Sequence, residues 1–322
     1  MKAWTVATLG EPRDVLELSE RPSPEPGPGQ VHVRVRATAA NFPDVLMIKG
    51  LYQVKPPLPF VPGVEICGDV IAVGAGVQHV RPGQRVAGMA AVPHGGFAEE
   101  ALLDATATMP VPDGISDEAA AALTIAYQTG WFGLHRRAHL QEGEWLLVHA
   151  AAGGVGSAAV QLGKAAGARV IGVVGGPDKV EVARRLGCDA VIDRRDEDVA
   201  ARVKEITEGH GADVVYDPVG GAAYQQSTKC IAFEGRIVVV GFTSGRTPEA
   251  AGSPGAPMDR SRKFLLTGAA AVGFLLGAAG VATAATGAIA PLVSERVPLE
   301  DLPDALSRLG AGDTTGRVVL TP

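Results

Sequence analysis

The feature that most constrains the fold is an apolar stretch that leads directly into a glycine-rich turn, WLLVHAAAGGVG at residues 145–156. Trp145–Val148 is expected to form a buried strand, and the apolar residues after Gly156 recur at helical spacing. A strand, a glycine turn and a helix together suit a dinucleotide pyrophosphate, because small residues admit the phosphates and the first N–H groups of the helix attract them. The residues expected to bind it are Ala152, Gly153, Gly154, Val155 and Gly156.

The residues around this turn support the same interpretation, since apolar runs alternate with helical segments. A helix is expected from about Asp178 to Leu186. The further apolar runs are Arg169–Val174, Ala190–Ile192, Val214–Asp217 and Ile237–Gly241. This alternation predicts a doubly wound parallel sheet, and it outweighs the presence of Ala151 at the first position of the usual G-x-G-x-x-G motif.

The end of the second apolar run bears on which dinucleotide binds. Sites that prefer NAD place a carboxylate about 20 residues beyond the turn to bind the ribose 2′-hydroxyl, whereas a 2′-phosphate needs a nearby cation. Here the run ends in Gly175-Gly176, and Lys179, Arg194 and Arg195 follow. We therefore expect NADPH, with Gly175, Lys179 and Arg194 as contacts.

Two other interpretations of this region stay open. Asp178 can cap the helix. It can also reach a ribose hydroxyl, and that contact would favour NADH. Lys179, Arg194 and Arg195 can also form a solvated basic face, which is the commoner fate of such residues.

Length and composition exclude several classes of protein. With 322 residues the chain exceeds one typical domain, and a net charge of −6 with 5% aromatic residues argues against a nucleic-acid surface. The three cysteines lack C-x-x-C spacing and predict no disulfide framework. The N-terminal residues MKAWTVATLG contain no apolar signal core, so a cytoplasmic protein is expected.

The first part of the chain is rich in predicted strands. Val31–Ala37 alternates as a half-buried strand does, and Asp69–Val73 and Arg85–Gly88 are separated by glycine and proline turns. This pattern predicts a small, partly closed barrel or sandwich. The C-terminal run Val318–Leu320 can return to it as a further strand, which would make this domain discontinuous in sequence.

Short motifs spread along nearly the whole chain resemble those of one family. They are Asn41-Phe42-Pro43-Asp44, Gly50-Leu51-Tyr52, Pro59 to Glu65, Gly95 to Glu99, Ala151 to Gly156 and Gly316 to Leu320. The chain resembles the medium-chain dehydrogenase/reductase superfamily, in its zinc-free quinone oxidoreductase (zeta-crystallin-like) branch. The resemblance implies a GroES-like catalytic domain from residues 1–122 and 258–322, a Rossmann domain from residues 123–257, NADPH as hydride donor, and a homodimer.

The resemblance also implies roles for single residues. Asn41 is expected to lie beside the nicotinamide, and Tyr52 at the mouth of the cleft, where a phenol can bind an oxyanion or relay a proton. A tyrosine packed into a turn is the alternative for Tyr52. Leu46 stands where many relatives have a second tyrosine, which implies a less polar pocket. The further implied cofactor contacts are Thr129, Gly241, Phe242 and Arg317.

The same comparison bears on metal. Zinc-dependent members carry a cysteine near the position of Asn41 and Gly-His-Glu where this chain has Gly63-Val64-Glu65, and the four-cysteine lobe is absent here. Without thiolate or imidazole at these positions no tetrahedral zinc site can be assembled, so we expect no metal. The substrate must then accept hydride readily, as a quinone or a carbon–carbon double bond conjugated to a carbonyl does.

The stretch from Phe264 to Ser294 contains no charged residue. It is long enough for a membrane span, but it is mostly alanine and glycine, whereas a lipid-facing span would be richer in Leu, Ile and Phe. Its first part is similar to the strands that extend the sheet across the dimer in the family. We therefore expect a dimer interface in which Ala269–Gly273 pairs with its own copy, with a membrane anchor as the alternative.

Two functional classes follow from these observations. The first is an NADPH-dependent reductase of quinones, with an enone or acryloyl-CoA-type double-bond reductase as a close variant. The second is an NADPH-binding protein of low turnover that serves a structural or sensing role. The expected partner is a small quinone or enone, with no nucleic acid and no membrane.

Overall fold

The structure is a computed structural model that describes residues 1–243, 262–265 and 286–322. The chain separates into a barrel unit, Met1–Ile125 with Val272–Pro322, and a parallel-sheet unit, Ala126–Ala271. Most of the uncharged stretch 264–294, including the dimer strand expected at Ala269–Gly273, lies outside the described residues. The homodimer therefore stays a prediction. Among the described residues, no helix has the length and apolar character needed to cross a membrane.

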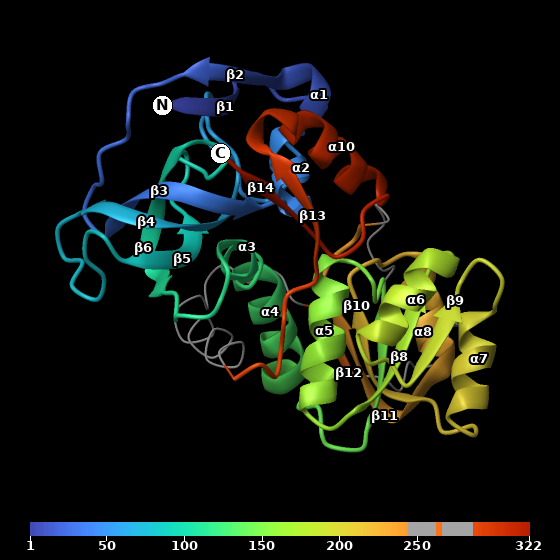
Figure 1. The fold of residues 1–322 in the computed structure, drawn as a ribbon. Helices are drawn as coiled ribbons and strands as arrows, with labels where there is room; N and C mark the ends of the chain where they lie inside the picture. Colours follow the sequence, from blue (N-terminus) through green and yellow to red (C-terminus); the bar gives the residue numbers. More distant parts are fainter. Residues whose placement is uncertain (244–261, 266–285) are drawn as a thin grey trace. The chain divides into compact units, whose positions relative to one another are not determined.

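The barrel unit is built from antiparallel strands that close on themselves (Figure 1). Strand β3 pairs with both β4 and β6, while β5 pairs with β4 and β6, so that four strands form a ring. The strands of the ring are β3 (Gln30–Ala39), β4 (Glu65–Val73), β5 (Arg85–Ala90) and β6 (Glu100–Pro110). The predicted small barrel is confirmed.

The C-terminus returns to this barrel, as the sequence predicts. β14 (Arg317–Thr321) pairs antiparallel with β3, with Val319 opposite Ala39, and β13 (Val293–Pro298) lies parallel to β14. A separate hairpin joins β1 (Lys2–Val6) to β2 (Leu16–Glu20).

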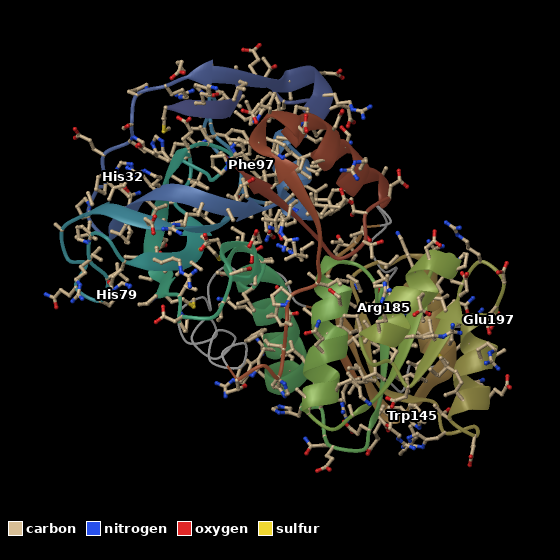
Figure 2. The ribbon with its side chains drawn as sticks, in the orientation of Figure 1. His32, His79, Phe97, Trp145, Arg185 and Glu197 are labelled. Atoms are coloured by element: carbon tan, nitrogen blue, oxygen red, sulfur yellow. The ribbon has the colours of Figure 1, made fainter. Side chains whose placement is uncertain are left out.

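Helices close one core of the barrel unit. Phe97, labelled in Figure 2, is fully buried in a cluster with Ile48 and Leu306. Ile48 comes from α2 and Leu306 from α10, which is amphipathic and ends where Gly312 adopts a left-handed φ of 78°. Among the described residues, the helices of this unit are α1 (Pro12–Val15), α2 (Phe42–Ile48), α3 (Asp117–Ala121), a 3₁₀ turn (Leu299–Asp301) and α10 (Leu302–Ala311).

The second unit contains a sheet whose strands are all parallel, with order β12-β11-β10-β7-β8-β9. Its centre is apolar on both faces, as expected for a sheet covered by helices on both sides (Figure 1). The strands are β7 (Trp145–His149), β8 (Arg169–Val174), β9 (Ala190–Asp193), β10 (Ala212–Asp217), β11 (Ile231–Val239) and β12 (Arg262–Leu265). The predicted doubly wound sheet is confirmed.

The helices between these strands follow the predicted order. The segment α4 (Thr124–Trp131) spans the division between the units and continues into a π-helix, Phe132–Arg137. The remaining helices are α5 (Gly154–Ala165), α6 (Pro177–Arg185), α7 (Val199–Ile206) and α8 (Ala222–Cys230). β12 pairs with β11, although it lies beyond the domain boundary expected at residue 257. The exact domain boundaries stay predictions.

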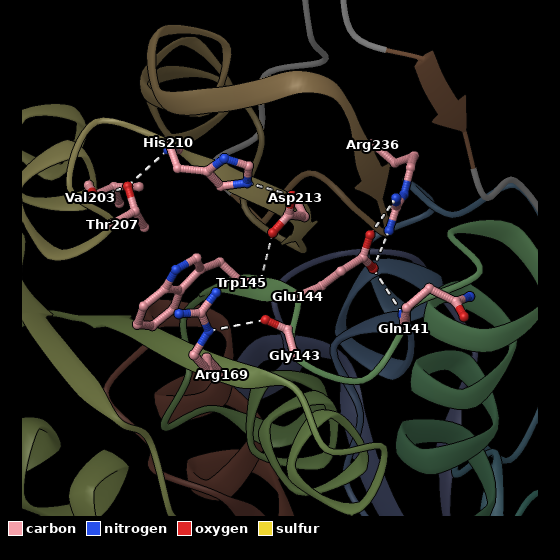
Figure 3. Close-up of polar contacts among 11 residues, drawn as sticks. Gln141, Gly143, Glu144, Trp145, Arg169, Val203, Thr207, His210, Asp213 and Arg236 are labelled. Atoms are coloured by element: carbon pink, nitrogen blue, oxygen red, sulfur yellow. Dashed lines mark hydrogen bonds and ion pairs between the residues drawn. The ribbon is translucent and has the colours of Figure 1, made fainter.

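Polar contacts fasten the amino ends of the parallel strands (Figure 3). The Asp213 carboxylate accepts the backbone N–H of Trp145 at 2.8 Å, and Arg236 binds Glu144. The guanidinium of Arg169 lies 4.2 Å from the Trp145 ring. These contacts tie β7, β8, β10 and β11 together at the amino ends of the strands. In sheets of this kind the loops that bind a ligand lie at the opposite, carboxyl ends.

Candidate cofactor site and buried polar network

The predicted glycine-rich turn joins β7 to α5 at the carboxyl edge of the parallel sheet. Gly153 is the N-cap of α5, and no side chain caps the helix. The first N–H groups of α5 therefore lack intrahelical partners, which suits a phosphate. Ala152 is buried, and Gly154, Val155 and Gly156 form the first turn of the helix.

Gly156 is required by close backbone packing. A Cβ atom at this position would lie 2.1 Å from the carbonyl oxygen of Ala150 and 2.7 Å from its carbonyl carbon. Neither backbone atom can move far, because Ala151 N–H binds the Val173 carbonyl at 3.1 Å and so ties the turn to β8. The turn thus has the compact form that brings a helix start against a strand end.

A second glycine turn follows β8 and lies against two arginines. A Cβ on Gly175 would lie 3.0 Å from an Nη atom of Arg194, and one on Gly176 would lie 2.8 Å from an Nη atom of Arg195. Both arginines are exposed, and in the described part of the chain neither guanidinium forms an ion pair. The two positive charges are therefore available to an anion at this turn.

An acid that no sequence motif indicates, Asp193, also lies at this turn. Asp193 is opposite Val174 in the β8–β9 register, and its two carboxylate oxygens accept the Gly176 N–H at 3.0 and 3.1 Å. The N–H groups of Gly176 and then Arg195 lower the pKa of the Asp193 carboxyl, which is held ionised. The only sequence signal was its place directly after the apolar run Ala190–Ile192.

The other predicted cofactor contacts in the parallel-sheet unit lie on separate elements. Lys179 is in the first turn of α6, where its N–H donates to the Gly176 carbonyl at 3.2 Å. Gly241 and Phe242 follow β11, and Phe242 packs against the core of this unit. They stand at the same carboxyl edge as the glycine turn, because all strands of the sheet are parallel.

Thr129 lies on α4, which packs against the helix that the glycine turn begins. A Cβ on Gly130 would lie 2.7 Å from a methyl of Leu162 on α5, so the two helices approach closely there. Thr129 is 9% exposed, and the adjacent Gln128 has a buried Nε2 with no hydrogen-bond partner among the described residues. An unsatisfied buried donor beside a predicted contact is compatible with a polar ligand at this position.

The predicted residues Asn41 and Arg317 meet in the interior of the barrel unit. Arg317 Nη1 donates to Asn41 Oδ1 at 2.9 Å, and its Nη2 binds Glu65 Oε2. Asn41 Nδ2 donates to Glu65 at 3.1 Å and to the carbonyl of Ala39 at 3.0 Å. All three side chains are 5% exposed or less, so they form a buried polar network. Both donors of the Asn41 amide are occupied within it.

Glu65, which in the sequence is only the last residue of the motif Pro59 to Glu65, is the centre of this network. Its second oxygen, Oε1, accepts the backbone N–H of Ile125 at 2.8 Å. Burial raises the pKa of the Glu65 carboxyl, and the neighbouring Arg317 acts in the opposite direction. Since the guanidinium is fixed beside it and Asn41 donates to it, we assign an ionised carboxylate here.

Asp44 holds the start of α2 beside this network. Its carboxylate accepts the backbone N–H groups of Asn41 at 2.8 Å, Val64 at 3.1 Å and Gly63 at 3.2 Å. Complete burial raises the pKa of Asp44 to about 7. Asp44 thereby connects the helix that begins at Asn41 to the segment that precedes β4.

Tyr52, the other predicted catalytic residue, lies outside this network. It follows α2 in a bend, and its half-buried ring packs against the same core cluster as Val64. An apolar groove adjoins Val64 in the barrel unit. Its lining contains no charged side chain and comprises Met47, Pro56, Phe60, Val61, Pro62, Gly63, Val64, Ala90, Val92 and Gly95.

The residues where the family resemblance implies a zinc site, Asn41, Val64 and Glu65, do not fit a zinc ion. Asn41 and Val64 offer neither thiolate nor imidazole, and both Glu65 oxygens already accept hydrogen bonds. In the described ranges no three His, Cys, Asp or Glu side chains come together as a metal site would require. His32 and His79, labelled in Figure 2, bind Glu100 and the Thr108 carbonyl instead, each within the barrel unit.

Comparison with known proteins identifies the family. Residues 27–113 match the model of the alcohol dehydrogenase GroES-like domain, and residues 154–290 match the model named zinc-binding dehydrogenase. The chain is 32% identical to quinone oxidoreductase-like protein 2 of Bos taurus over 296 residues, which cover 87% of this chain and 82% of that protein.

Two further similarities extend this finding. A quinone oxidoreductase-like protein 2 homolog of Nematostella vectensis is 45% identical over 210 residues, which cover 65% of this chain but only 57% of that protein. The crystal structure of Escherichia coli quinone oxidoreductase complexed with NADPH superposes with a TM-score of 0.91 at 31% identity, and the match covers both chains completely. The chain therefore belongs to the medium-chain dehydrogenase/reductase superfamily and is a quinone oxidoreductase-like member of it.

Proposed function

We propose that this protein is a zinc-independent reductase that transfers hydride from NADPH to a quinone. The observation that carries the proposal is the pair of exposed arginines, Arg194 and Arg195, on the glycine turn after β8, with the tight Gly156 turn at the same edge of the sheet. Together they provide a place for a pyrophosphate and a place for a 2′-phosphate. The solved relative from Escherichia coli was crystallised with NADPH, which supports the same cofactor here.

The residues of this chain have distinct tasks in the proposed reaction. The N–H groups of residues 154–156 hold the pyrophosphate, and Lys179 and Arg194 hold the 2′-phosphate. The bound cofactor supplies the hydride. Thr129, Gly241 and Phe242 orient the cofactor from the neighbouring loops and α4. The reaction then depends mainly on orientation and on exclusion of water, since no metal polarises the acceptor.

The barrel unit supplies the acceptor side in this proposal. The side chains around the small groove beside Val64 are all uncharged, and such apolar surroundings are compatible with an acceptor such as a quinone near this surface. We assign Asn41 and Tyr52 to this side: Asn41 as a rigid polar group, held by Glu65 and Arg317, and Tyr52 as a donor to the developing oxyanion. Arg317 fixes the orientation of the Asn41 amide by donating a hydrogen bond to its oxygen.

Cofactor preference tests the first half of the proposal. Arg194→Ala and Lys179→Ala should each weaken NADPH binding about tenfold or more, since each removes a charge-assisted phosphate contact, and should leave NADH binding nearly unchanged. The measurement is calorimetric titration of each variant with both cofactors. Equal affinity of the parent protein for NADH and NADPH would refute the assignment.

Turnover tests the second half. NADPH consumption should be measured with a panel of simple quinones, enones and acryloyl thioesters. We expect quinones to be reduced with the highest kcat/KM, and Tyr52→Phe to lower it through kcat. Preferred reduction of enones or thioesters would indicate a double-bond reductase, and tight NADPH binding without turnover on any of them would indicate a cofactor-binding protein.

A further inference from the structure

We propose that Asp193 is a positioning residue for recognition of the NADPH 2′-phosphate: its carboxylate fixes the Gly175-Gly176 turn and the backbone of Arg195, so that both arginine side chains face the phosphate. The inference rests on the proposed use of NADPH. It adds a residue that acts on cofactor choice without touching the cofactor.

The carboxylate of Asp193 joins two loops that are remote in sequence. It accepts the Gly176 N–H with both oxygens, at 3.0 and 3.1 Å, and the Arg195 N–H with Oδ1, at 3.1 Å. Gly176 has a φ of +105°, which side-chain-bearing residues rarely adopt. The residue of this turn with the left-handed φ is therefore the one whose N–H donates to the Asp193 carboxylate.

These hydrogen bonds also explain why an acid at this turn does not favour NADH. A carboxylate selects NADH when its oxygens are free to accept both ribose hydroxyls. Here both oxygens are directed at backbone N–H groups of the protein. The negative charge is thus compensated by the turn itself, while the Arg194 and Arg195 guanidinium groups lie over the two glycines.

The loop that carries the arginines is fixed from its other end as well. The Asp193 N–H donates to Glu197 Oε1 at 2.9 Å, and Glu197 Oε2 lies 2.7 Å from Arg202 Nε on α7. Figure 2 labels Glu197 in the turn that follows β9. Arg194 N–H binds the Val174 carbonyl at 3.0 Å. Positions 193–197 therefore form a short loop that is fixed by hydrogen bonds and an ion pair.

The test compares Asp193→Ala and Asp193→Asn with a control, Asp196→Ala. Asp196 is an exposed acid of the same loop, so its removal changes the local charge equally and leaves the hydrogen bonds of Asp193 in place. Binding of NADPH, NADH, 2′,5′-ADP and 5′-AMP is measured by calorimetry on the full-length protein. The two nucleotide fragments isolate the phosphate contribution and require no turnover.

We expect Asp193→Ala to lower the affinity ratio of 2′,5′-ADP to 5′-AMP about tenfold, because the turn and the arginines lose their common support. Asp193→Asn should retain most of the ratio, since the amide oxygen still accepts from Gly176 and Arg195. If the affinity ratio of 2′,5′-ADP to 5′-AMP rises in both Asp193 variants and in Asp196→Ala, Asp193 acts only by repelling the phosphate, and the proposal is overturned. An equal loss for all four ligands would also overturn it, as the sign of a purely structural role.

The outcome is separable from that of the proposed function. If the parent protein binds neither NADPH nor 2′,5′-ADP, the proposed cofactor itself is wrong. If the parent binds both and Asp193→Ala leaves the ratio unchanged, only the positioning role is refuted. Should Asp193→Ala fail to fold, Arg195→Ala with Asp193 intact tests the same geometry, and retention of the full ratio in that variant would count against it.

Discussion

At the scale of single residues, the Arg317–Glu65 pair shows how a buried charge constrains a site. The two side chains are 5% and 0% exposed, and Asn41 bonds to both. Two buried charges cost desolvation energy that only their mutual contacts offset, so removing one partner leaves the other uncompensated. The network thus fixes the Asn41 amide in one orientation.

Arg317→Met should consequently destabilise the protein by about 3–5 kcal/mol, because Glu65 would remain as an unpaired buried charge. The double variant Glu65→Gln with Arg317→Met should recover part of that loss. Urea unfolding of the parent, both single variants and the double variant gives the coupling energy between the two sites. Additive losses would show that the pair does not act as a unit.

Asp44 introduces a pH dependence at the same scale. Its pKa is raised from the ordinary value of 3.8 to about 7, mainly by burial. A folded-state pKa above the unfolded one means that the folded state holds the proton more tightly. The stability from this group is therefore fully present below about pH 4 and is lost as the pH rises through 7.

Unfolding free energy should accordingly fall between pH 5 and pH 8 in the parent, and this fall should be smaller in Asp44→Asn, whose side chain does not titrate. Asp113→Asn, which removes an exposed acid of the same unit, serves as the control and should keep the pH dependence of the parent. Urea titrations at a series of pH values provide the measurement. An identical pH dependence in Asp44→Asn and the parent would exclude Asp44 as its source.

At the scale of elements, the glycine turn between β7 and α5 determines where a phosphate can lie. Gly156→Ala would place a methyl 2.1 Å from the Ala150 carbonyl oxygen, so the turn must open. We expect NADPH and NADH to lose affinity together, about tenfold or more, since both carry the same pyrophosphate. This pattern differs from the NADPH-specific loss expected for Arg194→Ala.

Gly310→Ala offers a matched control for this change. Gly310 lies in α10 of the barrel unit, where an added Cβ would meet only a methyl of Val45 at 3.3 Å. Cofactor titrations of both variants make the comparison. Unchanged affinity in Gly156→Ala would mean that the turn does not carry the pyrophosphate.

Elements with a continuous apolar run could be predicted from sequence, whereas the exact ends of strands that are fixed by long-range pairing could not. β8 runs from Arg169 to Val174, as its six residues indicated. β4 begins at Glu65, four residues before the predicted start, because its first part is fixed by pairing with β3 and by Arg317. Periodicity cannot place a buried charged residue such as Glu65 in a strand unless its partner is known.

The same limit applied to the site. The glycine turn between β7 and α5 could be predicted because local sequence specifies it, and Arg194 stays a predicted cofactor contact. The contact of Asp193 with Gly176 depends on the β8–β9 register, which sets Asp193 opposite Val174. Likewise Asn41 and Arg317 are 276 residues apart, and the antiparallel pairing of β14 with β3 brings them together.

At the scale of the whole molecule, the chain matches the models of two domains, and the residues at the position where the family resemblance implies a zinc ligand set offer no thiolate or imidazole. The chain matches both family models, one of which is named zinc-binding dehydrogenase. Yet Val64 supplies no ligand atom, and Asn41 and Glu65 bind each other and Arg317. The Arg317 guanidinium is the positive charge that faces the Glu65 carboxylate in this interior.

Prolonged treatment with a strong chelator should therefore leave both the thermal unfolding temperature and NADPH turnover unchanged. A structural zinc would contribute directly to folding free energy, and a catalytic zinc would polarise the acceptor, so loss of either would be visible in one of the two measurements. Metal analysis of freshly purified protein supplies the control, because it separates a tightly held ion from an absent one. Stoichiometric zinc whose removal abolishes turnover would contradict the assignment, since the Asn41–Glu65–Arg317 network would then have to rearrange to admit a cation beside a buried guanidinium.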